Sequence, residues 1–94
     1  MPQATNEPRH PLASFLVDRR ERLNLSKRAV GIACRMSPSH VGDIESGRRS
    51  PSADGIARLA KVLKVSVATL IRLKARQQLA ELKERVQELE ARAS

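Results

Sequence analysis

Serines at three positions mark the starts of helices that lie only a few residues apart. Ser26, Ser37 and Ser52 are each followed by apolar residues at three-to-four spacing, which is typical of a helix with one buried face. Serine suits an N-cap because its hydroxyl accepts a hydrogen bond from a backbone N–H of the first turn. Pro38 suits a first helical position, where no N–H is needed, and Gly47 supplies a C-cap. The sequence therefore predicts short helices joined by tight turns.

The apolar spacing predicts an all-α fold, because no segment shows a β-strand pattern of comparable strength. From Val67 to the end, 28 residues contain no Gly or Pro, so the last helix is expected to continue far beyond the domain. We therefore predict a five-helix domain whose last helix extends into a short coiled-coil-like tail. The expected helices cover residues 11–23, 26–35 and 38–46, then a helix that Ser52 can cap and whose apolar stripe runs to Leu63, and a last helix from about residue 67 onward.

The length of the chain and its hydropathy limit what it can do. Its 94 residues support one small domain with an appendage, which leaves little room for a catalytic cleft between domains. No apolar run is long enough to span a membrane, and the first residues do not have the pattern of a secretory signal. A cytoplasmic location is therefore expected.

Metal, redox and enzymatic chemistry are not expected. Cys34 is the single cysteine, so it cannot form an intramolecular disulfide or complete a zinc site. Its place on an apolar stripe predicts a core thiol rather than a redox sensor. His10 and His40 have no cluster of metal-ligating residues around them. Because a nucleophile–base pair and a glycine-rich phosphate loop are also missing, we predict a non-enzyme without a cofactor.

The net charge of +8 is concentrated in the middle of the chain. Residues 12–76 carry +9, whereas residues 77–94 carry −1. A nucleic acid, an anionic membrane surface or an acidic protein could each bind such a basic region. Residues 1–10 are polar and are expected to form a disordered arm. In that arm, Arg9 and His10 either enter a minor groove, as some N-terminal arms do, or belong to a plain tail.

Two of the expected helices, 26–35 and 38–46, are joined by only a few residues within the basic region. Such a pair is typical of a helix-turn-helix, whose second helix stands out from the body and places its N-terminal end in a major groove. Gly31 would let the two helices approach closely, because glycine has no Cβ. The alternative is an ordinary helix pair in a small helical protein. Phe15 is the only aromatic residue, which disfavours single-strand binding by base stacking.

The sequence across this pair resembles the helix-turn-helix domain of the Cro and lambda-repressor type, known as the XRE family. The resemblance rests on LSKRAVGIACRMSPSHVGDIESGRRSPS, followed by IARLAKVLKVSVATLI, and it keeps the family spacing without a gap. It covers about residues 12–73 and implies an all-α DNA-binding domain. The most characteristic matches are Ser26, Gly31, Cys34, Val41, Ile44, Glu45, Gly47, Pro51, Leu59, Ala60 and Val65.

The resemblance also implies which residues contact DNA. The base-reading positions of the family fall on Pro38, Ser39 and Asp43, with His40 beside them. Proline can only touch a thymine methyl, serine can reach several bases, and aspartate suits the cytosine amino group. The expected phosphate contacts are Lys27, Arg28, Ser37, Arg48 and Arg49. Phosphate contacts are therefore expected to supply most of the affinity, and base contacts a modest selectivity.

The sequence departs from the family pattern at several positions. Lys27 stands where members usually have Gln, and it can still meet a phosphate as a point charge. Gly42 occupies a position that is commonly polar. Arg35 and Lys64 stand where the family often has Gly after a helix, which predicts strained or differently shaped turns. Glu45 is expected to brace an arginine or a backbone group inside the domain, because phosphates repel a carboxylate.

An apolar seam with heptad spacing follows the domain. The domain core is expected to include Leu70, Ile71 and Leu73. When the heptad spacing of the seam is extended backward it meets Arg72, a charged residue that fits poorly in an apolar seam. An unpartnered apolar stripe favours association, so a partner is expected. The residues expected to mediate dimerisation are Leu79, Leu82, Val86 and Leu89.

Charges beside the seam favour pairing of two identical chains. In a parallel pair, Arg85 would face Glu90 of the other chain, which is a permitted contact across a coiled-coil seam. We therefore predict a homodimer. The expected domain organisation is a disordered arm (1–10), a helix-turn-helix DNA-binding domain (11–73) and a C-terminal helical dimerisation extension (74–94).

Two classes of function follow from these features. The first is a transcriptional regulator, by resemblance a repressor, that binds double-stranded DNA sequence-specifically as a dimer on a two-half-site operator. The alternative is an antitoxin-like or protein-docking module, in which the C-terminal helix binds a different protein. A stoichiometric unrelated partner on purification would favour the second class.

Overall fold

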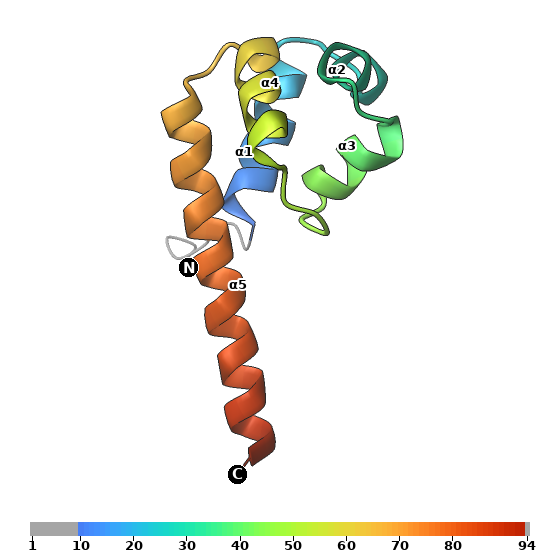
Figure 1. The fold of residues 1–94 in the computed structure, drawn as a ribbon. Helices are drawn as coiled ribbons and strands as arrows, with labels where there is room; N and C mark the ends of the chain where they lie inside the picture. Colours follow the sequence, from blue (N-terminus) through green and yellow to red (C-terminus); the bar gives the residue numbers. More distant parts are fainter. Residues whose placement is uncertain (1–9, 94) are drawn as a thin grey trace, which may run out of the picture.

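Five α-helices follow one another in the computed structural model, which describes residues 10–93 (Figure 1). Each of the first three begins and ends within one residue of its expected limits, and the predicted all-α class is confirmed. We call residues 10–77 the head and residues 78–93 the tail. Arg9 and most of the predicted disordered arm lie outside the described residues. The helices are α1 (Pro11–Arg22), α2 (Lys27–Cys34), α3 (Pro38–Glu45), α4 (Ala53–Leu63) and α5 (Val67–Ala93).

The predicted serine caps form at the starts of α2, α3 and α4. In each case the serine hydroxyl oxygen accepts a hydrogen bond from a backbone N–H of the first turn, which would otherwise lack a partner. Each cap contributes about 1 kcal/mol to helix stability. The bonded pairs are Ser26 with Ala29 (2.9 Å), Ser37 with His40 (3.1 Å) and Ser52 with Gly55 (3.2 Å).

The core of the head is formed by apolar side chains from all five helices. α1 and α4 lie in the middle, with α5 packed against one side of them and the α2–α3 pair on the other (Figure 1). Cys34 is fully buried, as predicted, and this burial raises the pKa of its thiol, which keeps the sulfur protonated and unreactive. The buried core residues are Leu12, Leu16, Val30, Cys34, Val41, Ile44, Ile56, Leu59, Ala60, Leu63 and Leu70.

The turn between α2 and α3 requires glycine at position 31. A Cβ on Gly31 would lie 2.5 Å from the carbonyl oxygen of Met36, so the close approach predicted there is made to the backbone of the turn. The Met36 N–H donates to the Gly31 carbonyl at 2.7 Å. Arg35 has a left-handed backbone with φ of 58°, a conformation that costs a non-glycine residue about 1 kcal/mol. The predicted strain at this turn is therefore present.

Another left-handed residue ends α4. Lys64 has φ of 59°, and the following Val65 N–H donates to the Ala60 carbonyl at 3.0 Å, closing the last turn. The two positions at which the family often has glycine thus keep the glycine conformation with Arg35 and Lys64. Both turns therefore have the left-handed backbone that glycine usually adopts, although Arg35 and Lys64 stand there.

The first part of α5 is held on the head by a buried side chain that the sequence does not single out. Gln77 is only 3% exposed, and its Oε1 accepts the N–H of Ala13 at 3.0 Å. Ala13 lies in the first turn of α1, where backbone N–H groups have no partner within the helix. Lys74 Nζ donates to the Pro51 carbonyl at 2.7 Å. These bonds fix the direction in which α5 leaves the head.

Ile71 was expected in the core, and this prediction is wrong. Its side chain is 56% exposed, whereas Leu70 beside it is fully buried and Leu73 is half-buried. α5 meets α1 and α4 through the face that carries Leu70 and Gln77, and residue 71 lies about one third of a helical turn away from that face. None of the helices within residues 10–93 combines the length and apolar character needed to cross a bilayer.

Candidate nucleic-acid interface

The start of α3 is presented to solvent on the side of the head away from α5. Pro38, Ser39 and His40 lie in its first turn and Asp43 in the next one. Pro38 and Ser39 are exposed, and His40 and Asp43 are half-buried. The opposite face of α3 carries Val41 and Ile44, which are buried in the core. The four positions predicted to read bases therefore share the outer surface of one helix.

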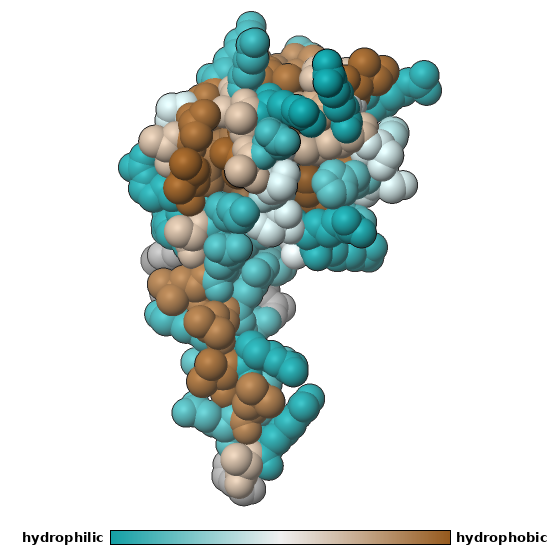
Figure 2. Space-filling model, in the orientation of Figure 1, coloured by the Kyte–Doolittle hydropathy of each residue, from teal (hydrophilic) through white to brown (hydrophobic). Residues whose placement is uncertain are grey.

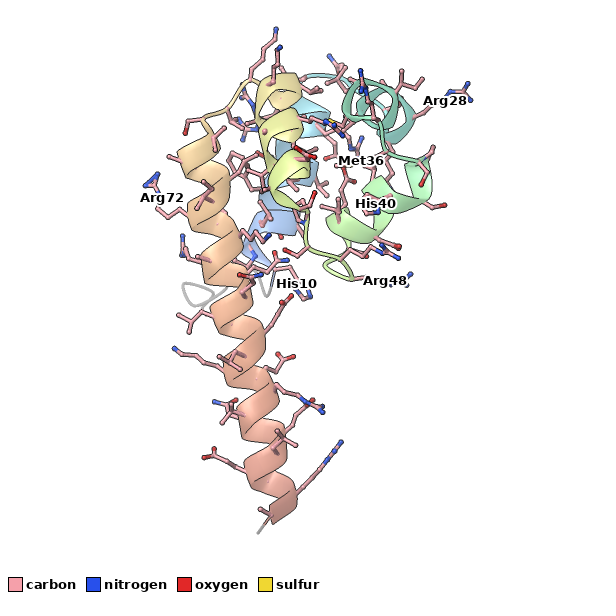
Figure 3. The ribbon with its side chains drawn as sticks, viewed as in Figure 1. His10, Arg28, Met36, His40, Arg48 and Arg72 are labelled. Atoms are coloured by element: carbon pink, nitrogen blue, oxygen red, sulfur yellow. The ribbon has the colours of Figure 1, made fainter. Side chains whose placement is uncertain are left out.

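Basic side chains flank α3 at both ends. Lys27 and Arg28 lie in the first turn of α2, and Arg48 and Arg49 lie in the loop after α3, all four being exposed. Figure 3 shows Arg28 and Arg48 on either side of His40, with Arg72 on the far side of the molecule. A cationic rim around an exposed helix is the arrangement expected where phosphates on both sides of a groove are contacted.

Asp43 connects α3 with the basic loop. Its carboxylate oxygens lie 3.8 Å from Arg48 Nη1 and 3.6 Å from Arg49 Nε. Its carbonyl accepts the backbone N–H groups of both arginines at 2.9 and 3.1 Å. The predicted base reader is thus next to two predicted phosphate contacts, and their positive charges offset the repulsion that a carboxylate meets near DNA.

Ser37 has a structural role in addition to its predicted contact. Its hydroxyl oxygen accepts the N–H of His40 at 3.1 Å, which caps α3. The hydroxyl keeps a hydrogen that it can donate to a phosphate oxygen, because serine is a donor as well as an acceptor. The cap and the predicted phosphate contact are therefore compatible.

A largely buried ion pair fixes α3 against α1. Arg20 donates to Glu45 through Nε at 2.6 Å and through Nη2 at 3.1 Å, and it also donates to the Leu25 carbonyl at 2.8 Å. The hydrogen bond to Glu45 raises the pKa of Arg20 above its ordinary value. The prediction that Glu45 braces an arginine inside the domain is confirmed. The pair holds the end of α3 and the entry to α2 in one orientation.

His10, the last residue of the expected arm, lies between the end of α3 and the tail. Its imidazole occupies the space where a Cβ on Gly47 would be, 2.7 Å from the nearest ring atom. Nδ1 is 3.5 Å from a carboxylate oxygen of Glu81 on α5. The sequence offers no signal for this contact or for the Gln77 bond, because both side chains are polar and read as surface residues.

The comparisons agree with this geometry. Residues 11–73 match the family model described as a helix-turn-helix domain, and the chain belongs to this helix-turn-helix family. It is a DNA-binding domain of the kind found in transcription regulators, not an enzyme. The resemblance of the sequence to a helix-turn-helix domain is therefore confirmed. Among curated proteins, none matches the sequence significantly.

Solved structures of two regulators are similar to the chain. The clp gene regulator ClgR from Corynebacterium glutamicum shares 30% identity over 73% of this chain and 92% of its own, with a TM-score of 0.62. The restriction-modification controller protein C.AhdI from Aeromonas hydrophila shares 26% identity over 66% of this chain and 94% of its own, also with a TM-score of 0.62. Both similarities support DNA binding and transcription regulation.

Proposed function

We propose that the chain represses transcription by binding a double-stranded DNA operator as a homodimer, with one α3 helix in each half-site. The observation that carries the proposal is the exposed outer face of α3 between two pairs of basic residues, held in place by the Arg20–Glu45 pair. A helix presented in this way fits the width of a major groove, and its basic rim reaches the phosphates on either side.

Base selectivity comes from the outer face of α3. Ser39 and His40 offer hydrogen-bonding groups, Pro38 offers an apolar contact to a thymine methyl, and Asp43 accepts from a cytosine amino group. None of these is a bidentate arginine or glutamine contact to a base, which gives the strongest discrimination. The proposed selectivity per base pair is therefore modest.

Affinity comes mainly from phosphate contacts by the basic rim and the Ser37 hydroxyl. Four cationic side chains in each copy, Lys27, Arg28, Arg48 and Arg49, would displace condensed counterions from the duplex. For a dimer that uses all of them, affinity is expected to fall about 10⁴-fold between about 50 and 200 mM salt.

The test of DNA binding is the salt dependence of affinity for labelled duplex DNA. Arg49→Ala is expected to lower affinity on all sequences and to reduce the slope of log affinity against log salt by about one for each copy bound. Arg72→Ala is the matched control, because Arg72 is an exposed arginine on the far side of the molecule (Figure 3). A flat salt dependence of the native chain, or equal losses in the two variants, would contradict the proposal.

Dimerisation is assigned to the tail. Leu79, Leu82, Val86 and Leu89 are between 43% and 61% exposed, so they contribute nothing to the core of the head. A chain truncated after Gln77 keeps the bond to Ala13 and is expected to be a folded monomer by analytical ultracentrifugation. A dimer of the truncated chain would show that the tail is not the interface. A stoichiometric unrelated protein that copurifies with the full chain would instead support the antitoxin-like alternative.

A further inference from the structure

The loop after α3 is packed against the imidazole of His10, the residue before α1. A Cβ on Gly47 would lie 2.7 Å from one ring atom and 2.8 Å from two more, so the ring lies directly on the glycine backbone. Gly47 has φ of 85°, a conformation that favours glycine. Arg48 and Arg49 follow it in the chain. The ring therefore packs on the turn from which two proposed phosphate contacts extend.

The same imidazole also meets the tail. Its Nδ1 is shielded from solvent and makes no hydrogen bond within residues 10–93, and a carboxylate oxygen of Glu81 lies 3.5 Å from it. Buried polar atoms are nearly always hydrogen-bonded, so an exception calls for a physical explanation. A ring with a proton on Nδ1 presents an N–H to this carboxylate, and a ring with both protons adds an ionic attraction. In Figure 3, His10 lies beside α5 on the side of the loop that carries Arg48.

Charged groups from two other parts of the chain surround this ring. The tail supplies two carboxylates, which line one cavity with the imidazole. The loop after α3 supplies two guanidinium groups next to Gly47, and a carboxylate of α3 within 4 Å of both offsets their charge. Figure 2 shows hydrophilic surface where the head meets the tail on this side. A charged imidazole is therefore attracted to α5. In the order given, these groups are Glu81 and Glu84, Arg48 and Arg49, and Asp43.

We propose that His10 is a positioning residue for DNA binding. Held by Glu81 on α5, its ring fixes the turn at Gly47, so that the two arginines after the turn are presented to phosphates. The inference rests on the proposed function and adds to it a residue that itself touches no DNA. A loop that is ordered before binding loses less conformational entropy on the duplex, so it binds more tightly.

The contact joins the head to the tail at a junction without a flexible linker. α5 is continuous over Val67–Ala93, and the bond from Ala13 to Gln77 holds it on α1 one turn before Glu81. The ion pair of His10 with Glu81 is a second link between the start of α1 and α5. In the proposed dimer, tails joined to their heads in this way hold the two α3 helices at one separation. The operator is therefore expected to tolerate a single half-site spacing.

The first test replaces the ring and measures affinity for labelled duplex DNA at pH 6. His10→Ala is expected to lower affinity about threefold, because the turn loses both its packing and its link to the tail. His10→Phe keeps a flat ring on Gly47 and is expected to restore part of this loss. The His10 side chain makes no capping bond to α1, so neither change removes a helix cap. Affinity of a folded His10→Ala equal to that of the native chain would overturn the inference.

The second test is the pH profile of affinity, which a purely steric role of the ring would not change. An imidazole gains its charge between about pH 8 and 5, so affinity is expected to rise as the pH falls from 8 to 6. In Glu81→Gln this rise is expected to be about twofold smaller. His40 is present in both proteins, so its contribution cancels. Identical profiles of the native chain and Glu81→Gln would overturn the inference.

Glu88→Gln is the matched control for the pH profile. It makes the same change of charge on α5, two turns further from the head, at an exposed position. It is expected to keep the rise of affinity that the native chain shows. Sedimentation equilibrium of all variants measures self-association beside DNA affinity. A loss of affinity in Glu81→Gln that a matching loss of self-association accounts for would overturn the inference.

A measurement without DNA separates this inference from the proposed function. In nuclear magnetic resonance spectra of the free chain, the Gly47 amide signal is expected to follow the titration of the imidazole, and in His10→Phe this dependence is expected to disappear. If the native chain binds no duplex, the proposed function fails, while a Gly47 signal that titrates still supports the hold of His10 on the loop. A Gly47 signal with the same pH dependence in both proteins would overturn the inference even if DNA is bound.

Discussion

The head buries most of its large apolar side chains against its own helices, whereas the tail leaves its large apolar side chains in solvent. The head also carries the positive charge, +9 over residues 12–76, while residues 77–94 carry −1. A basic region with a closed core can fold alone and bind a polyanion. A near-neutral helix with one apolar face reaches its lowest free energy only when that face is covered. In the function we propose, this difference assigns DNA binding to the head and association with another chain to the tail.

Ile71 shows that this division does not follow the end of the domain. It belongs to the head by position, but its side chain is exposed like those of the tail. Gln77 shows the reverse, because it stands beyond the expected domain limit and is buried in the head. The two kinds of surface therefore overlap over about two turns of α5, between residues 71 and 77.

The largest expected effect concerns the largely buried ion pair of the head. Glu45→Ala leaves the Arg20 guanidinium without its carboxylate partner, and we expect the free energy of unfolding in urea to fall by about 3 kcal/mol. Asp18→Ala is the control, because the Asp18–Arg22 pair is exposed and its loss is expected to cost less than about 0.5 kcal/mol. Equal effects of the two changes would show that the pair does not support the head.

The next effect concerns the junction of head and tail. Gln77→Ala leaves the Ala13 N–H buried without a hydrogen-bond partner, so stability is expected to fall by about 1–2 kcal/mol. Gln78→Ala, at the exposed neighbouring position, is expected to change stability very little. Thermal and urea unfolding measure both variants. If Gln77→Ala behaves like Gln78→Ala, the buried glutamine does not fix α5 on the head.

A smaller effect concerns the DNA-facing side of the head. Asp43→Ala removes the acceptor proposed for a cytosine amino group, so preference at one position of each half-site is expected to change by about 1 kcal/mol, roughly fivefold. Competition binding with single-base variants of the selected duplex measures this. A uniform gain on every sequence would mean that Asp43 only offsets the charges of Arg48 and Arg49, which lie within 4 Å of it.

The smallest effect concerns backbone strain in the head. Lys64→Gly relieves a left-handed residue with φ of 59° and is expected to raise stability by about 0.5–1 kcal/mol. Lys61→Gly, inside α4, is expected to lower stability by a similar amount, because glycine is unfavourable in a helix. Urea unfolding compares the signs. A loss of stability in both variants would show that the turn at Lys64 is not strained.

The sequence predicts well those features that depend on neighbouring residues. The caps of Ser26, Ser37 and Ser52 form because each serine needs only the N–H of its own first turn. The Glu45 brace was predicted by elimination, because a carboxylate beside phosphates is unfavourable. The outer face of α3 follows from the opposite, apolar face of the same helix.

Features that depend on how α5 meets the rest of the head could not be predicted from its sequence. Leu70 and Ile71 are equally apolar, and only the position of α1 and α4 decides which of them is covered. Gln77 is buried because the unpartnered N–H of Ala13 lies opposite it, a contact across 64 positions of sequence. The position of His10 against Gly47 likewise depends on two segments far apart in the chain.

The most direct measurement is selection of duplexes bound by the full chain from a random pool, followed by the stoichiometry of the selected complex. We predict an enriched pair of inverted half-sites, about one helical turn apart from centre to centre and at a single spacing, bound by two copies of the chain. Enrichment of no sequence, or of a single site bound by one copy, would contradict a dimer that reads DNA with α3 and associates through α5.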